Sequence, residues 1–409
     1  MRWQVLAAFL VTCPAPAQQP VNYLLNHPAI EYMKRPLHDP VAELSRRVEA
    51  GKLQLRYDGA QGYLSSVLQA LDVPVESQMA VFSKTSVQRL RIDPQHPRVL
   101  YFNDSVVVGW VPHGTLEFAA LDPQQGIIFY TVDQRDWVYR KRLANSAAAP
   151  PLFVRRTDCL SCHVSKVTGG IPGTLLRSVY PWIDGTPLAQ FGSFNTDQRT
   201  PFDKLWGGWY VTGDSGSAHH MGNSVLTTLK PPANLQLLKT PFDAGIYLSP
   251  HSDIVALMVF EHQTRMMNLM IEIGWKTRAG VYQAGTLRRA AHELAEYMLF
   301  VDQPPLVSPI HGASGFAEKF AVEGPRDSHG RSLRQFDLKH RLMRYPCSYL
   351  IYSDAFDQLP PEAKDAIYRE MWDVLSSPRF SPGDRQAIVE ILRDTRKGLP
   401  DYFVVPAIG

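Results

Sequence analysis

The stretch from Thr157 to Lys166 reads TDCLSCHVSK and contains three side chains that could do chemistry together. Cys159, Cys162 and His163 form the pattern C-x-x-C-H, in which two thiols add to the vinyl groups of a haem and the adjacent histidine binds its iron. One such motif predicts one covalently attached haem c per chain. We therefore expect Cys159 and Cys162 to hold the cofactor and His163 to be the proximal iron ligand.

A C-x-x-C pair can also begin a zinc site, but zinc needs four nitrogen or sulfur ligands. No second C-x-x-C or H-x-x-x-H pair follows the motif in this chain. The residues from Thr168 to Gly173 instead form a loop rich in glycine and proline, which could lie against the edge of a porphyrin. The sequence thus favours haem over zinc.

The sixth iron ligand has to come from another part of the chain. Small c-type cytochromes often use a methionine from a downstream loop, and Met221 lies in the glycine-rich, polar segment WGGWYVTGDSGSAHHMGNSV, where a methionine has little packing role. The neighbouring His219 and His220 are alternatives, and so is His262 in VFEHQTRMMNLM. An open sixth position is also compatible with the sequence. We take Met221 as the first candidate.

The N-terminus decides whether haem attachment is feasible, because c-type haem is attached outside the cytoplasm. The chain begins MRWQVLAAFLVTCPAPAQQ, with a cation at Arg2, a short apolar run and the cleavage pattern Ala15-Pro16-Ala17. Residues 1–17 are therefore a predicted signal peptide, and the mature protein is expected in the periplasm or secreted. Lipidation of Cys13 is a less favoured alternative.

Charge and cysteine content argue against nucleic-acid binding and against a disulfide-stabilised fold. The formal net charge is +3, and loss of the signal peptide removes one positive charge with Arg2, so no basic surface for nucleic acid is predicted. Outside the motif and the signal peptide the only cysteine is Cys347, so no disulfide framework exists. We expect Cys347 to be a small buried side chain, although a reactive thiol is an alternative.

The elements that must position the motif follow from periodicity and predict an α+β fold. Residues 38–72 are expected to be helical, with one helix through VAELSRRVEAGKLQL and a second near 63–71. A meander of antiparallel strands follows, because four runs rich in β-branched and aromatic residues alternate with turn residues. These predicted strands span residues 98–102, 105–111, 116–122 and 126–133.

The chain after the meander is divided into a loop-rich segment and a helical half. Residues 151–250 form the predicted haem-binding segment, with a hairpin in SVYPWIDGTPLAQFGSF. Residues 251–409 are expected to be helical and to pack on that segment; residues 18–150 hold the helical start and the meander. A long helix follows Asp253, and its polar residues exclude a membrane span. Further helices are predicted at 286–301, 361–376 and 382–396.

Five blocks of sequence, RRTDCLSCH, LWGGWYVTGDSGSAHHMGN, FEHQTRMMNLM, RYPCSYLIYSDAFDQLP and AIVEILRDTRKGLPDYF, resemble a group of exported bacterial proteins described as single-haem and cytochrome c-like. The resemblance covers most of the chain from Cys159 onward and, weakly, the predicted strands. Only C-x-x-C-H among these blocks has known chemistry. The resemblance therefore implies haem and export, and no particular reaction.

Two classes of function are compatible with these observations. An exported electron carrier would have a six-coordinate iron held by His163 and Met221. A haem-dependent oxidoreductase or ligand sensor would keep an open distal site. The size of the chain favours this second class, whereas the available methionine and the lack of a second haem favour the carrier, which we take as the first hypothesis. The redox partner or substrate is not identified by the sequence.

The long predicted helix could supply polar groups to an open distal site. Glu261, Arg265 and Asn268 are spaced to share one helical face, and His262 with Arg265 would resemble an acid and base pair. The alternative is an ion pair between Glu261 and Arg265, with His262 bonded to the backbone.

Four basic residues flank the motif and could guide an acidic redox partner. They are Arg155, Arg156, Lys166 and Arg177.

Overall fold

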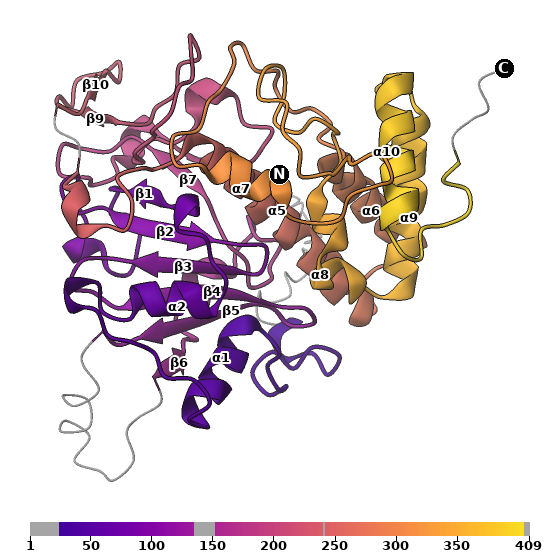
Figure 1. Ribbon diagram of the computed structural model, residues 1–409, viewed down its shortest axis with the longest axis horizontal. Coiled ribbons are helices and arrows are strands. Elements are labelled where there is room, and N and C mark those ends of the chain that lie inside the picture. Colours follow the sequence, from indigo (N-terminus) through magenta and orange to yellow (C-terminus); the bar gives the residue numbers. More distant parts are fainter. Residues whose placement is uncertain (1–23, 135–151, 240–241, 405–409) are drawn as a thin grey trace, which may run out of the picture.

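The computed structural model describes residues 24–134, 152–239 and 242–404. The predicted signal peptide, Cys13 and the expected cleavage site lie outside these residues. The described chain is α+β, with an antiparallel sheet in the N-terminal half and helices in the C-terminal half, which confirms the predicted fold class. In Figure 1 the sheet lies on one side and α9 and α10 lie on the other, with α5 between them.

Six strands form one sheet in chain order, and each pairs with the next in antiparallel fashion. All four predicted strands are present within one residue of their expected ends, and β1 and β6 extend the sheet on either side. The sixth strand belongs to the segment that carries the motif. The strands are β1 (Met79–Val81), β2 (Arg98–Phe102), β3 (Val106–Trp110), β4 (Leu116–Asp122), β5 (Gly126–Val132) and β6 (Phe153–Arg155).

Two small two-stranded sheets follow the motif. The pairing of β7 (Arg177–Val179) with β8 (Ser193–Asn195) confirms the predicted hairpin, and β9 (Ser224–Leu226) pairs with β10 (Leu235–Leu237).

The first helix is shorter than predicted. Helix α1 (Pro40–Glu49) begins after Asp39, whose side chain accepts hydrogen bonds from the first turn. It ends before Gly51, which adopts a φ of +67°, while the amide of Lys52 returns to the carbonyl of Arg47. This left-handed glycine closes the helix, and only a short 3-10 turn (Gly59–Gln61) lies between it and α2 (Leu64–Ala70).

Helix α5 (Ile254–Arg278) is the central element of the core. Twenty of its 25 residues are buried, because the sheet lies on one side and α6 and α9 lie on the other. Asp253 caps its N-terminus as predicted, accepting from the amides of Val255 and Ala256. The other helices are α4 (Leu160–His163), α6 (Ala284–Met298), α7 (Phe316–Val322), α8 (Asp354–Asp357), α9 (Pro361–Ser376) and α10 (Pro382–Thr395).

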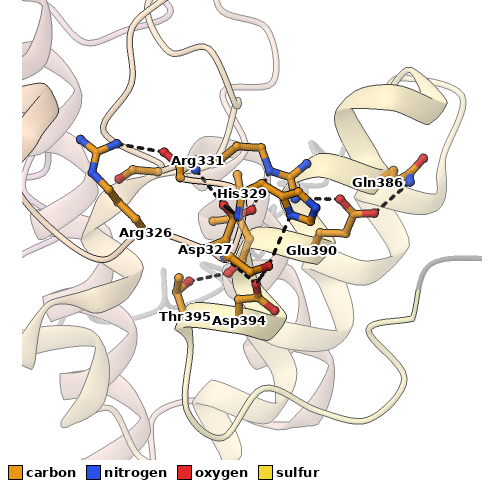
Figure 2. Close-up of polar contacts among 12 residues, drawn as sticks. Arg326, Asp327, His329, Arg331, Gln386, Glu390, Asp394 and Thr395 are labelled. Atoms are coloured by element: carbon orange, nitrogen blue, oxygen red, sulfur yellow. Dashed lines mark hydrogen bonds and ion pairs between the residues drawn. The ribbon is translucent and has the colours of Figure 1, made fainter.

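A polar network fastens the loop before the last helices to α10. Asp327 accepts a 2.6 Å hydrogen bond from Nε of Arg331, whose guanidinium also donates to Glu390 of α10 at 2.7 Å (Figure 2). Burial opposes ionisation of Asp327, but hydrogen bonds from Arg331 outweigh it and lower the pKa of this carboxyl. None of the helices in the described ranges is long and apolar enough to cross a membrane.

Candidate functional site

The C-x-x-C-H motif forms a single helical turn, α4, directly after β6. The amide of His163 donates to the carbonyl of Cys159 at 3.0 Å, which closes the turn. Nδ1 of His163 lies 2.8 Å from the carbonyl oxygen of Gly173, and the amide of Gly173 donates back to the carbonyl of His163 at 3.0 Å. The predicted loop from Thr168 to Gly173 therefore folds back on the motif and fixes the histidine ring.

This contact determines which ring nitrogen is available. A carbonyl oxygen only accepts, so Nδ1 of His163 must carry the proton and Nε2 is left with its lone pair. Among the described residues, Nε2 has no hydrogen-bond partner. Histidines that bind metals usually donate their other N–H to a carbonyl or carboxylate in this way. The Nε2 of His163 could therefore act as a metal ligand.

The two cysteines lie at the surface of the same turn. Cys162 is exposed and Cys159 is half-buried, and neither forms a disulfide. Burial raises the pKa of the Cys159 thiol to about 11, so this thiol is protonated at neutral pH.

The histidine ring rests on the six-stranded sheet. The rings of His163 and Phe129 are 4.6 Å apart between centroids, and Phe129 lies on the central part of β5. We call the side of the sheet that carries Phe129 the His163 face. The register places Ala119 opposite Phe129 and Val107 opposite Ala119 on this face.

Helix α5 holds the segment after the motif in place. The side chain of Asn268 accepts from the amide of Thr174 at 3.1 Å and donates to its carbonyl at 2.8 Å. Asn268 therefore satisfies both backbone groups of the residue next to Gly173, as a neighbouring strand would. We had expected Asn268 to share a polar helical face with Glu261 and Arg265. Instead, it holds the backbone of Thr174 in place.

The side chains around the motif do not gather into a cluster of metal ligands in the described ranges. No group of three or more His, Cys, Asp or Glu side chains in these ranges converges to hold a metal ion directly. Zinc needs four such ligands. Cys159, Cys162 and His163 are arranged differently, along the surface of one helical turn.

Met221 is packed in the interior, which corrects the expectation that it has little packing role. Its side chain is 5% exposed, and its sulfur accepts a hydrogen bond from the Ser178 hydroxyl at 3.6 Å. No contact among the described residues joins Met221 to His163. Ligation of iron by this thioether would require the sulfur to leave Ser178.

The two neighbouring histidines differ from each other. His219 is exposed, whereas His220 is half-buried against the rings of Trp206 and Phe202. Nδ1 of His220 accepts from the amide of Gly222 at 3.1 Å. Burial, with His219 nearby, lowers the pKa of His220 to about 4, so it is neutral at physiological pH.

His262 is fully buried and both of its nitrogens are occupied. Nδ1 contacts the side chain of Gln198, and Nε2 lies 2.7 Å from the Ser348 hydroxyl, while the ring stacks on Phe300. Burial lowers its pKa to about 3. His262 therefore bonds to side chains and not to the backbone, and it is a structural residue of the core.

Both expectations for Glu261 and Arg265 are wrong. Arg265 pairs with Glu293 of α6 at 2.6 Å, because it points out of the core. Glu261 points inward, is 2% exposed and accepts from the Thr196 hydroxyl at 3.0 Å. Burial raises the pKa of Glu261 to about 8, so it is protonated at neutral pH. Glu261 and Arg265 therefore form no ion pair, and Arg265 does not form the predicted acid and base pair with His262.

The substitution Glu261→Gln tests this assignment through the pH dependence of stability. The folded protein keeps a proton on Glu261 up to about pH 8, whereas the unfolded chain releases it near 4.5. The free energy of unfolding should therefore fall as the pH rises through that window. We expect Glu261→Gln to remove part of this fall in urea titrations at several pH values. Glu293→Gln, a partly exposed control, should leave the slope unchanged; parallel profiles for wild type and Glu261→Gln would contradict the assignment.

Three of the four basic residues near the motif already have partners. Arg155 donates to the carbonyl of Tyr32 at 2.7 Å, Arg156 pairs with Asp158 at 2.6 Å, and Arg177 donates to the Ser193 hydroxyl at 2.6 Å. Lys166 is exposed. The predicted role of these four residues in guiding a partner stays a prediction.

No protein family, no curated protein and no solved structure matches this chain. The resemblance to exported single-haem proteins thus stays a prediction. Sequence reasoning missed Phe129 and the carbonyl of Gly173 as the groups that hold the His163 ring. A backbone carbonyl leaves no signal in residue types, and Phe129 could be found only from the register of β5.

Proposed function

We propose that this protein is an exported c-type cytochrome with one haem attached to Cys159 and Cys162, and that it transfers electrons. The observation that supports this most is the hydrogen bond from Nδ1 of His163 to the carbonyl of Gly173. It sets the tautomer that leaves Nε2 free for iron. The haem would supply an iron that cycles between two oxidation states.

The surroundings of the motif fit a flat apolar group. Cys159, Leu160 and Val164 are half-buried apolar side chains at the motif, and Val167 is 39% exposed just beyond it. Apolar surface gathered at one place usually marks a site for a partner or ligand. The chain itself would orient His163 through Gly173 and Phe129 and exclude water from one side of the bound group.

Covalent attachment is the direct test. We expect the protein, exported in a host with haem-ligation machinery, to show the mass of the mature chain plus one haem. Because thioether bonds are covalent, this mass should survive acid and organic extraction, as intact-mass spectrometry can check. Isolation of a haem-free protein that binds stoichiometric zinc through Cys159 and Cys162 would overturn the proposal.

Export is a second expectation of the same proposal. The mature chain should begin near Gln18, because Ala15-Pro16-Ala17 matches the small-residue cleavage pattern. N-terminal sequencing of protein from the periplasm and the medium checks this. Retained Met1 or a lipid-modified Cys13 would contradict cleavage at this position.

The identity of the sixth iron ligand distinguishes an electron carrier from an enzyme or sensor. We propose Met221 for the carrier version, since a thioether ligand fills the coordination site and favours Fe(II). The second candidate is a haem enzyme or ligand sensor with an open distal site. It is favoured by the Ser178 hydrogen bond that occupies the Met221 sulfur and by the two occupied nitrogens of His262.

A further inference from the structure

Part of the His163 face of the sheet is left uncovered beside the motif. Helix α5 contacts this face through the ring of Phe260 on the ring of Phe102, at the end of β2. The register places Val107 and Ala119 in one row with Phe102, and Glu117 in the next row on the same face; all three are only half-buried. On the opposite side of the same strands, Val108, Phe118 and Ala120 are buried. The central strands therefore present an accessible apolar strip next to His163.

A half-buried ion pair lies beside this strip. Arg98 of β2 donates to Glu117 of β4 at 2.8 Å, across the intervening strand β3. Gly109 lies between them and has no side chain; a Cβ there would come within 3.6 Å of the Glu117 carboxylate. The side chains of Arg98 and Glu117 are 21% and 16% exposed. The glycine thus lets the two charges meet above the sheet.

Arg98 has capacity for another anion. Its NH1 group contacts Glu117, but its Nε–H is buried and has no hydrogen-bond partner among the described residues. A buried unpaired donor costs about 1–3 kcal/mol. Such a cost is normally offset by a partner, and a carboxylate is the partner that a guanidinium fork fits best.

The register places this pair close to the His163 ring. Glu117 and Thr131 form the same-face pair next to Ala119 and Phe129, and neighbouring pairs on one face are about 7 Å apart. Burial lowers the pKa of His163, and the charges of Arg98 and Glu117 also act on it, in opposite directions. A cation, an apolar strip and a histidine with a free Nε2 therefore lie along one side of the sheet.

We infer that the haem lies on the His163 face, against Val107 and Ala119, and that Arg98 is the counter-ion of one of its carboxylates. This inference rests on the proposed function and adds which residues of the sheet the haem would contact and which cation would pair with its carboxylate. The haem has the two properties that the site demands, a flat apolar ring and acidic side chains. It would also be tethered beside this face through Cys159 and Cys162. Arg98 is a positioning residue, and Glu117 orients its guanidinium.

The redox potential tests the counter-ion. Loss of a cation near the iron favours Fe(III), and an unpaired Glu117 acts in the same direction. In the haem-loaded Arg98→Gln protein, we expect the ratio of reduced to oxidised protein at a fixed solution potential to fall about tenfold, or about 59 mV for a one-electron couple. Arg98→Lys should recover most of this shift. Arg89→Gln removes an exposed cation from the segment before β2 and should leave the potential unchanged.

A steric variant tests the wall independently of charge. Ala119→Trp should fill the strip and remove most of the haem-loaded protein, whereas Ala317→Trp, at a half-buried site on α7, should load haem normally. Equal potentials for Arg98→Gln and Arg89→Gln, or full haem loading of Ala119→Trp, would overturn the inference. If Arg98→Gln does not fold, Arg98→Lys and Ala119→Trp decide. A wild-type protein without covalent haem would instead overturn the proposed function itself.

Discussion

The double variant Cys159→Ser, Cys162→Ser is expected to lose all haem that survives acid and organic extraction. Thioether bonds need both sulfur atoms, and a serine hydroxyl forms no such bond with a vinyl group. The fold should persist, because Cys162 is exposed, Cys159 is half-buried and neither forms a disulfide. Each single variant should retain one bond and a haem with one unreacted vinyl group, which mass spectrometry and the absorption maximum can both detect.

Cys347 provides a matched control for the cysteine variants. It is fully buried, and Cys347→Ala should lower the free energy of unfolding by about 1 kcal/mol while leaving covalent haem unchanged. Loss of haem in Cys347→Ala but not in the double variant would show that the motif is not the attachment site.

Replacing Met221 with Leu is expected to convert a low-spin ferric spectrum into a high-spin one. Leucine fills a similar volume and should cost less than about 1.5 kcal/mol, but it cannot bind iron. With the sixth position open, imidazole and carbon monoxide should bind rapidly, and the potential should fall because the thioether no longer stabilises Fe(II). Electronic absorption in both oxidation states measures these changes.

A substitution at a second buried methionine shows whether a spectral change comes from the loss of an iron ligand or from altered packing. Met371 of α9 is fully buried, and Met371→Leu should leave the spectrum of the haem unchanged. If the wild-type protein already binds imidazole rapidly, or if Met221→Leu keeps the wild-type spectrum, Met221 is not the ligand. The enzyme or sensor with an open distal site would then be the favoured function.

Local sequence patterns predicted most of the described fold. The strands β2 to β5 follow from runs of β-branched and aromatic residues between turn residues, and α5, α9 and α10 follow from Asp253, Pro361 and Ser381 at their starts. The short strands β1 and β6 were missed because three residues give no periodic signal. Their existence depends on pairing with a neighbour far along the chain.

The sequence predicted only those candidate site residues that lie close together in the chain. Cys159, Cys162 and His163 are adjacent in the chain, so their types and spacing identify them. The direction of the α5 side chains was not predictable, because the helix is buried nearly all round and its polar residues do not mark a solvent face. Glu261 and His262 therefore enter the core and Arg265 leaves it, against both expectations.

The side-chain amide of Asn268 links the segment after the motif to α5, which is synthesised much later than the motif. Asn268 holds Thr174 from a position 94 residues further on, and Thr174 follows the Gly173 that fixes the His163 ring. A chain that emerges from a membrane with its N-terminus first would therefore expose Cys159 and Cys162 well before α5 arrives to close this contact. If the protein is exported and carries haem as proposed, this order would give a ligating enzyme an interval in which the motif is not yet folded against Thr174.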